Sequence, residues 1–123
     1  MAIAAAKSVT PRDAPLAGLL FRLRGLQAAR EPDYTIPEWV EFEGVRYVEL
    51  DGEAEIVPGV GVLPTPGHTP GHQSVLVETE DGLVVVAGDV AYRWEDFDAA
   101  GGVILALEPR RIWLAHETAP RDA

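Results

Sequence analysis

The stretch TPGHTPGHQSVLVETEDGLVVVAGDVAY, residues 65–92, decides the fold and the site of this chain. It begins with a loop that holds two Pro-Gly pairs and two histidines, continues through two apolar segments, and reaches Asp89. The Pro-Gly pairs make the loop stiff and tightly turned, which fixes the direction of a histidine ring. Residues 74–79 and 83–87 predict two neighbouring strands joined by a tight turn. Histidines and an aspartate where strands end are what a metal site at a sheet edge requires.

Composition limits what the rest of the chain can be. Its 123 residues suffice for one domain with a modest core, and 47% of them are hydrophobic, as in globular proteins. The 20 acidic residues outnumber the 10 basic ones, which argues against nucleic acid as a partner. Cysteine is absent, so disulfides and thiolate zinc sites are excluded. No apolar run approaches the length of a membrane span, and we expect a cytoplasmic protein that does not enter the membrane.

Charge and periodicity divide the chain into three parts. Residues 1–26 predict an N-terminal helical segment, with leucines at helical spacing over residues 8–26. We interpret this helix as an ordinary packed one, with a basic amphipathic helix for a membrane surface or partner as the alternative. Residues 27–44 contain prolines without a clear period and predict an irregular connector. Residues 1–30 contain five basic residues and one acidic residue, whereas residues 31–123 contain five basic and 19 acidic residues.

Residues 45–123 form the β-rich part. Asp51-Gly52 predicts a hairpin turn between the first two strands, and the close spacing of the strands predicts an antiparallel meander. Residues 83–87 are apolar at every position, so we expect that strand to be buried on both faces. Residues 95–107 are weakly helical. The expected strands are residues 45–50, 54–57, 60–63, 74–79, 83–87 and 111–115.

Three side chains are placed to hold a metal ion. His68 lies in the stiff loop, Asp89 follows a buried strand, and His116 ends the last apolar run. Imidazole and carboxylate ligands suit zinc, iron or manganese. His72 is interpreted as a residue that supports the ligands or the loop and does not itself bind the metal, because its spacing from His68 within a Pro-Gly loop does not place both on one face. Tyr92, three residues after Asp89, is a candidate to direct its hydroxyl into the same site.

TPGHTPGH, the downstream Asp89 with Tyr92, and Leu114-Ala115-His116 together resemble the C-terminal half of a metallo-β-lactamase-fold hydrolase. The closest branch is the N-acyl homoserine lactonase-like group, and the resemblance covers about residues 28–117. It implies an α+β fold: a partial αβ/βα sandwich with an antiparallel meander, one N-terminal helix and one or two C-terminal helices.

The resemblance also implies roles for the candidate residues. His68 would bind one metal of a dinuclear zinc centre, Asp89 would bridge both metals, and His116 would bind the second. Tyr92 would hydrogen-bond the carbonyl of a lactone whose ring is opened by metal-activated hydroxide, so Asp89 and Tyr92 are the expected catalytic residues. The substrate expected is a small-molecule ester or lactone.

The chain departs from the family pattern in one respect. The motif His-x-His-x-Asp-His, which supplies further ligands in the family, is absent, and all three histidines are already assigned. We therefore expect at most one zinc ion, weak or no activity, and a truncated domain whose exposed sheet edges favour a homo-oligomer. A non-catalytic truncated or fused domain, at most a mononuclear metal binder, is the first alternative. A glyoxalase II-like thioesterase is the second.

Overall fold

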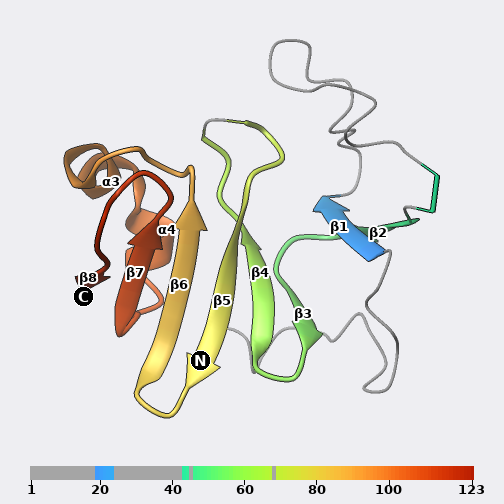
Figure 1. The fold of residues 1–123 in the computed structure, drawn as a ribbon, viewed down its shortest axis with the longest axis horizontal. Helices are drawn as coiled ribbons and strands as arrows, with labels where there is room; N and C mark the ends of the chain where they lie inside the picture. The colour runs from blue at the N-terminus through green and yellow to red at the C-terminus, as the bar shows by residue number, and fades with distance from the viewer. Residues whose placement is uncertain (1–18, 24–42, 45, 68) are drawn as a thin grey trace.

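The computed structural model describes residues 19–23, 43–44, 46–67 and 69–123. Six of its strands form one sheet in the order β3-β4-β5-β6-β7-β8, and the other two form a separate sheet, β1-β2 (Figure 1). The strands are β1 (Leu19–Leu23), β2 (Arg46–Leu50), β3 (Ala54–Val57), β4 (Val60–Pro64), β5 (Gln73–Thr79), β6 (Gly82–Gly88), β7 (Arg111–Leu114) and β8 (Arg121–Asp122).

The large sheet begins as an antiparallel meander and then changes direction. Strands β3 to β6 pair antiparallel in chain order, which confirms the expected meander. Strand β7 then pairs parallel with β6, because two short helices, α3 (Trp94–Ala100) and α4 (Gly102–Leu105), carry the chain back along the sheet. These helices match the weak helical pattern predicted over residues 95–107. The parallel pairing places the ends of β6 and β7 at the same sheet edge.

The core lies between the two helices and one face of the large sheet. Alternate residues of β5, β6 and β7 face inward, as the period of two in a strand requires. Phe97 of α3 and Ile104 of α4 are fully buried against them. The buried members from the sheet are Leu63, Leu76, Leu83, Val85, Ala87, Ile112 and Leu114.

The opposite face of the large sheet is apolar but partly exposed. Val86 is 44% exposed and its register partner Trp113 is 41% exposed. The prediction that residues 83–87 are buried on both faces is therefore wrong. The helices cover only the face that carries Leu83, Val85 and Ala87, which leaves Val86 on the other face.

Two further predictions, the helix over residues 8–26 and the hairpin at Asp51-Gly52, differ from the structure. The helix expected over residues 8–26 is wrong at Leu19–Leu23, which form β1 and pair parallel with β2, because tertiary strand pairing outweighs weak helix propensity. The hairpin expected at Asp51-Gly52 is also wrong, since β2 pairs with β1 and β3 pairs with β4. Gly52 still turns the chain with a φ of 85°. Leu50 and Ala54, on either side of this turn, pack in the same buried cluster, but their strands do not pair with each other.

The remaining N-terminal predictions fall largely outside the described residues. The division between the N-terminal segment, residues 1–26, and the connector, residues 27–44, lies outside the described residues, as does nearly all of the connector. Within the described residues, no helix is long and apolar enough to cross a membrane. The α+β class predicted from the sequence is confirmed by the mostly antiparallel sheet and its two helices.

Candidate metal and active site

Asp89 and His116 meet at one edge of the large sheet. Asp89 directly follows β6 and His116 lies two residues beyond β7, and these strands are parallel neighbours. Nε2 of His116 lies 3.2 Å from Oδ1 of Asp89. The main-chain N–H of Ala115 donates to the carbonyl of Gly88 at 3.0 Å, which holds the two loops together. Both side chains remain accessible, with 58% of His116 and 37% of Asp89 exposed.

The carboxylate of Asp89 has spare coordinating capacity. Its Oδ1 atom is shielded from solvent and makes no well-aligned hydrogen bond with the described residues, so the 3.2 Å contact with His116 is an ion-pair distance only. Two ligands on one tetrahedral zinc ion lie roughly 3.4 Å apart, given metal–ligand bonds of about 2.0–2.2 Å. The Asp89–His116 pair therefore fits two positions of a zinc site. Within the described part of the chain, no group of three or more His, Asp or Glu side chains is placed to hold a metal.

Tyr92 lies beside this pair. Its ring centroid is 4.5 Å from that of His116, and the planes meet edge to face at 62°. The side chain is 45% exposed, so a ligand can reach it. A phenol next to a histidine and a carboxylate provides a hydrogen-bond donor where a polarised carbonyl oxygen could lie.

His72 connects Asp89 to Thr65, because one ring nitrogen contacts each of these residues. The main-chain N–H of Asp89 donates to Nε2 at 3.0 Å, so Nε2 carries no proton. The proton is then on Nδ1, which lies 3.0 Å from the carbonyl oxygen of Thr65 and 2.9 Å from its Oγ1. Because both nitrogens have partners, this ring connects the Pro-Gly loop to the residue that follows β6.

Beneath His72 lies a buried polar pair that the sequence did not indicate. Thr65 Oγ1 and Ser74 Oγ are 2.7 Å apart, and the two residues are 1% and 0% exposed. Buried hydroxyls are retained where they satisfy each other, and here they anchor both ends of the histidine loop. Ordinary Thr and Ser residues give no sequence signal for this role, because only the pairing of β4 with β5 brings them together.

Gly88 allows the close approach of His72 to Asp89. Its φ is +57°, in the left-handed region that favours glycine. A Cβ at this position would lie 2.8 Å from Nε2 of His72, closer than real contacts allow. The Gly88-Asp89 dipeptide therefore requires glycine for both the turn and the hydrogen bond.

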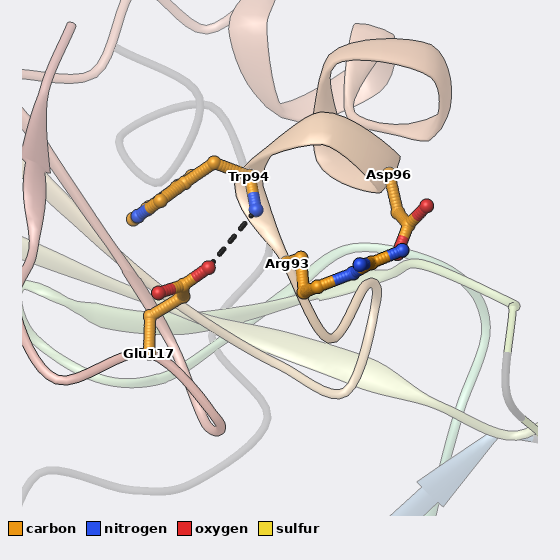
Figure 2. Close-up of polar contacts among 4 residues, drawn as sticks. All are labelled: Arg93, Trp94, Asp96 and Glu117. Carbon is orange, nitrogen blue, oxygen red and sulfur yellow. Dashed lines mark hydrogen bonds and ion pairs between the residues drawn. The ribbon is translucent and has the colours of Figure 1, made fainter.

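The loop of His116 is attached to α3. Figure 2 shows the Glu117 carboxylate reaching the start of the helix, where the main-chain N–H of Trp94 donates to its Oε1 at 3.1 Å. Arg93, which precedes the helix, supplies no side-chain cap of its own and instead pairs with Asp96 at 3.5 Å. Glu117, 23 residues away in sequence, thus satisfies a helix-terminal donor and holds the neighbouring His116 in place.

Two hollows adjoin the Asp89–His116 pair. One, of about 360 Å³, has an apolar lining and includes Gly88 and Ala115, the residues before Asp89 and His116. The other, of about 220 Å³, includes Asp89, Tyr92 and Asp96. The structure therefore brings three of the predicted site residues together and places His72 behind them, whereas His68 lies outside the described residues.

A comparison with protein-family models matches residues 10–118 to the metallo-beta-lactamase superfamily. The chain belongs to this superfamily. The match covers most of the chain, including β6, β7 and the loops that carry Asp89 and His116. The resemblance stated from the sequence is thereby confirmed at the level of the superfamily.

Several of the similar proteins within the superfamily are N-acyl homoserine lactonases. An N-acyl homoserine lactonase from Bacillus sp is 42% identical over 73 residues, which are 58% of this chain and 29% of the relative. A crystal structure of a B. thuringiensis AiiA variant with N-decanoyl-L-homoserine bound at the active site superposes with a TM-score of 0.66 and 28% identity. A second structure, an N-acyl homoserine lactone hydrolase with N-hexanoyl-L-homoserine at its catalytic metal centre, gives the same score and identity.

Each superposition covers only part of this chain and part of the solved structure. Each covers 81% of this chain and 47% of the solved structure. The chain thus spans about half the length of the solved lactonases and less than a third of the Bacillus sp relative. The partial lactonase-like fold predicted from the sequence agrees with this coverage.

Proposed function

We propose that this chain carries a zinc site that supports hydrolysis of a neutral ester or lactone. The observation that supports the proposal most directly is the convergence of Asp89 Oδ1 and His116 Nε2, 3.2 Å apart, at an accessible sheet edge. Tyr92 lies within ring contact of the same histidine. The similarity to N-acyl homoserine lactonases favours a lactone over other esters.

The ligands proposed for the zinc ion are Asp89, His116 and His68. His68 is included because the TPGH loop precedes β5, and the residues at the other end of that loop already contact Asp89 through His72. Three protein ligands with one open position are the usual composition of a catalytic zinc site. When bound, zinc would supply Lewis-acid polarisation of a carbonyl and a more acidic water.

The chain's own residues would orient the substrate. The Tyr92 hydroxyl is proposed to donate to the carbonyl oxygen and to stabilise the negative charge that develops there. His72 would keep Asp89 in place through the main-chain hydrogen bond at 3.0 Å. In the net reaction the oxygen of water bonds to the carbonyl carbon, the bond to the alkoxy oxygen breaks, and one proton of water ends on that oxygen.

We propose that the chain binds no more than one zinc ion and hydrolyses its substrate slowly. The three histidines of the chain supply two proposed ligands and one residue whose ring nitrogens are both occupied. A second metal would need further ligands, and the acidic residues nearest the site are engaged elsewhere, since Asp96 pairs with Arg93 and Glu117 accepts from Trp94. A metal-binding domain without catalysis is the second candidate, favoured by the short span that the chain shares with its relatives.

Turnover of an N-acyl homoserine lactone by zinc-loaded protein tests the proposal. We expect slow hydrolysis that is lost in Asp89→Asn and His116→Ala and reduced in Tyr92→Phe. A thioester assayed in parallel separates the lactonase from the thioesterase alternative. Zinc binding without turnover of either substrate would leave the non-catalytic metal binder as the function.

A further inference from the structure

We propose that the segment after His116 holds α3 and Tyr92 at the candidate site. Its positioning residues are Glu117 and Arg121, and we call residues 117–121 the C-terminal strap. The effect of the strap on catalysis rests on the proposed function, because it concerns the placement of Tyr92 beside His116. Its contacts with α3 can be tested without zinc or substrate.

Helix α3 depends on tertiary contacts for its position. It has seven residues, and a helix this short has little stability of its own in water. It begins two residues after Tyr92. Asp96 and Ala100 of this helix line the hollow of about 220 Å³ that also includes Asp89. A shift of α3 would therefore move Tyr92 and change one wall of that hollow.

Glu117 holds the start of the helix. Its Oε1 accepts a hydrogen bond from the main-chain N–H of Trp94 at 3.1 Å. Trp94 lies two residues after Tyr92, and Glu117 directly follows His116. The bond therefore restrains both members of the Tyr92–His116 ring contact, whose centroids are 4.5 Å apart.

Arg121 holds the middle of the helix. The guanidinium carbon of Arg121 lies 4.5 Å from the ring centroid of Trp94 and 5.3 Å from that of Phe97. Its Nη2 atom donates to Oδ1 of Asp98 at 2.7 Å. The Asp98 side chain is 61% exposed, and exposed ion pairs contribute little. Contact of the guanidinium with the two rings is thus expected to provide most of the restraint.

The strap is attached to the strand that also positions His116. Strand β8 pairs antiparallel with β7, and Arg121 lies opposite Ile112 in that pairing. Ile112 is fully buried in the core, and β7 ends two residues before His116. Through the strap, the positions of α3 and of His116 are therefore both fixed relative to β7.

Nuclear Overhauser effects between the ring protons of Tyr92 and His116 measure the contact in the full chain with no zinc added. Glu117→Ala and Arg121→Ala should each lose most of this signal. Glu117→Gln should keep it, because an amide oxygen also accepts a hydrogen bond from Trp94. Arg121→Lys should behave as Arg121→Ala does, since an ammonium group cannot stack on rings as the planar guanidinium does.

Arg93→Ala is the matched control. Arg93 pairs with Asp96 at 3.5 Å, and its side chain runs along α3 away from Glu117 (Figure 2). The variant removes an ion pair of the same helix without changing the strap, so it should keep the ring–ring signal. An unchanged signal in Glu117→Ala or Arg121→Ala, with circular dichroism that shows folded protein, overturns the proposal. An equal loss in Arg93→Ala overturns it as well.

Hydrolysis by the zinc-loaded protein tests whether the strap acts through Tyr92. Displacement of a reacting group by about 1 Å can cost roughly 100-fold in rate, so Arg121→Ala should lower kcat by about 10- to 100-fold, with a smaller change in KM. In a Tyr92→Phe background the same change should cost less than about twofold, because the hydroxyl that the strap positions is already absent. Equal losses in both backgrounds would assign Arg121 a general role in stability and overturn the proposal.

The two sets of measurements separate the strap from the proposed function. If the zinc-loaded protein hydrolyses neither a lactone nor a thioester while the ring–ring signal still depends on Glu117 and Arg121, the proposed function is wrong and the strap is supported. If Arg121→Ala hydrolyses the lactone as fast as the unmodified chain, the strap is wrong and the proposed function is supported.

Discussion

Replacing Gly88 by alanine should separate the loop of Asp89 from His72. At a φ of +57° an alanine costs about 1–2 kcal/mol relative to glycine. Its Cβ would lie 2.8 Å from His72 Nε2, and the ring cannot move freely because Nδ1 is bonded to Thr65. Loss of the bond from the Asp89 N–H adds about 1–3 kcal/mol, so we expect a total destabilisation of about 2–5 kcal/mol.

Thermal and urea unfolding measure this change. At about 4 °C per kcal/mol for a chain of this size, the melting temperature should fall by roughly 8–20 °C. Gly102→Ala is the matched control, because its Cβ meets nothing within 4 Å and α4 should gain up to about 1 kcal/mol. Gly88→Ala should also weaken zinc binding, since Asp89 shifts. Equal stability of the two variants would refute the role given to His72.

Three further predictions concern the buried hydroxyls, the core and the C-terminal edge. Thr65→Val removes the contacts of Oγ1 with Ser74 and His72 and should destabilise the chain by about 1–3 kcal/mol in urea unfolding, and a change under ~0.5 kcal/mol would contradict the buried network. Phe97→Ala empties a fully buried position and should cost about 3–5 kcal/mol, where a cost near zero would show that the helices do not cover the sheet. The pKa of Asp122 is lowered below its ordinary value of 3.8, chiefly by the hydrogen bond from Arg111. The ionised Asp122 carboxylate therefore stabilises the fold at pH values above 3.8, and this stabilisation disappears as the pH falls through the lowered pKa. Asp122→Asn should therefore melt below the unmodified chain at pH 7, the gap should close in strong acid, and a gap independent of pH would exclude this ion pair as its cause.

The sequence predicts those features of the fold that depend on local pattern. Alternating valines and tight turns predict strands β3 to β6. The two Pro-Gly pairs, Asp89 and His116 indicate the end of the sheet at which the candidate site lies. Leu19–Leu23 fit a helix equally well, and only pairing with β2 decides that they form a strand. Such pairing is a long-range interaction that local propensity does not contain.

Other parts of the site depend on contacts that no motif encodes. Glu117 reaches Trp94 across 23 residues, and Thr65 meets Ser74 through the pairing of two strands. The exposure of Val86 could not be read from an apolar run, because burial depends on which layer covers each face. The pattern of residues 83–87 predicts the strand but does not show which of its two faces is buried.

Zinc binding by the full chain is the measurement that tests the proposed site most directly. Calorimetric titration should give no more than one zinc ion per chain, with binding lost in Asp89→Asn and His116→Ala. Asp81→Asn, the same change in the turn between β5 and β6, should bind zinc as the unmodified chain does. Two tightly bound zinc ions, or binding that survives Asp89→Asn, would contradict the site described at the ends of β6 and β7.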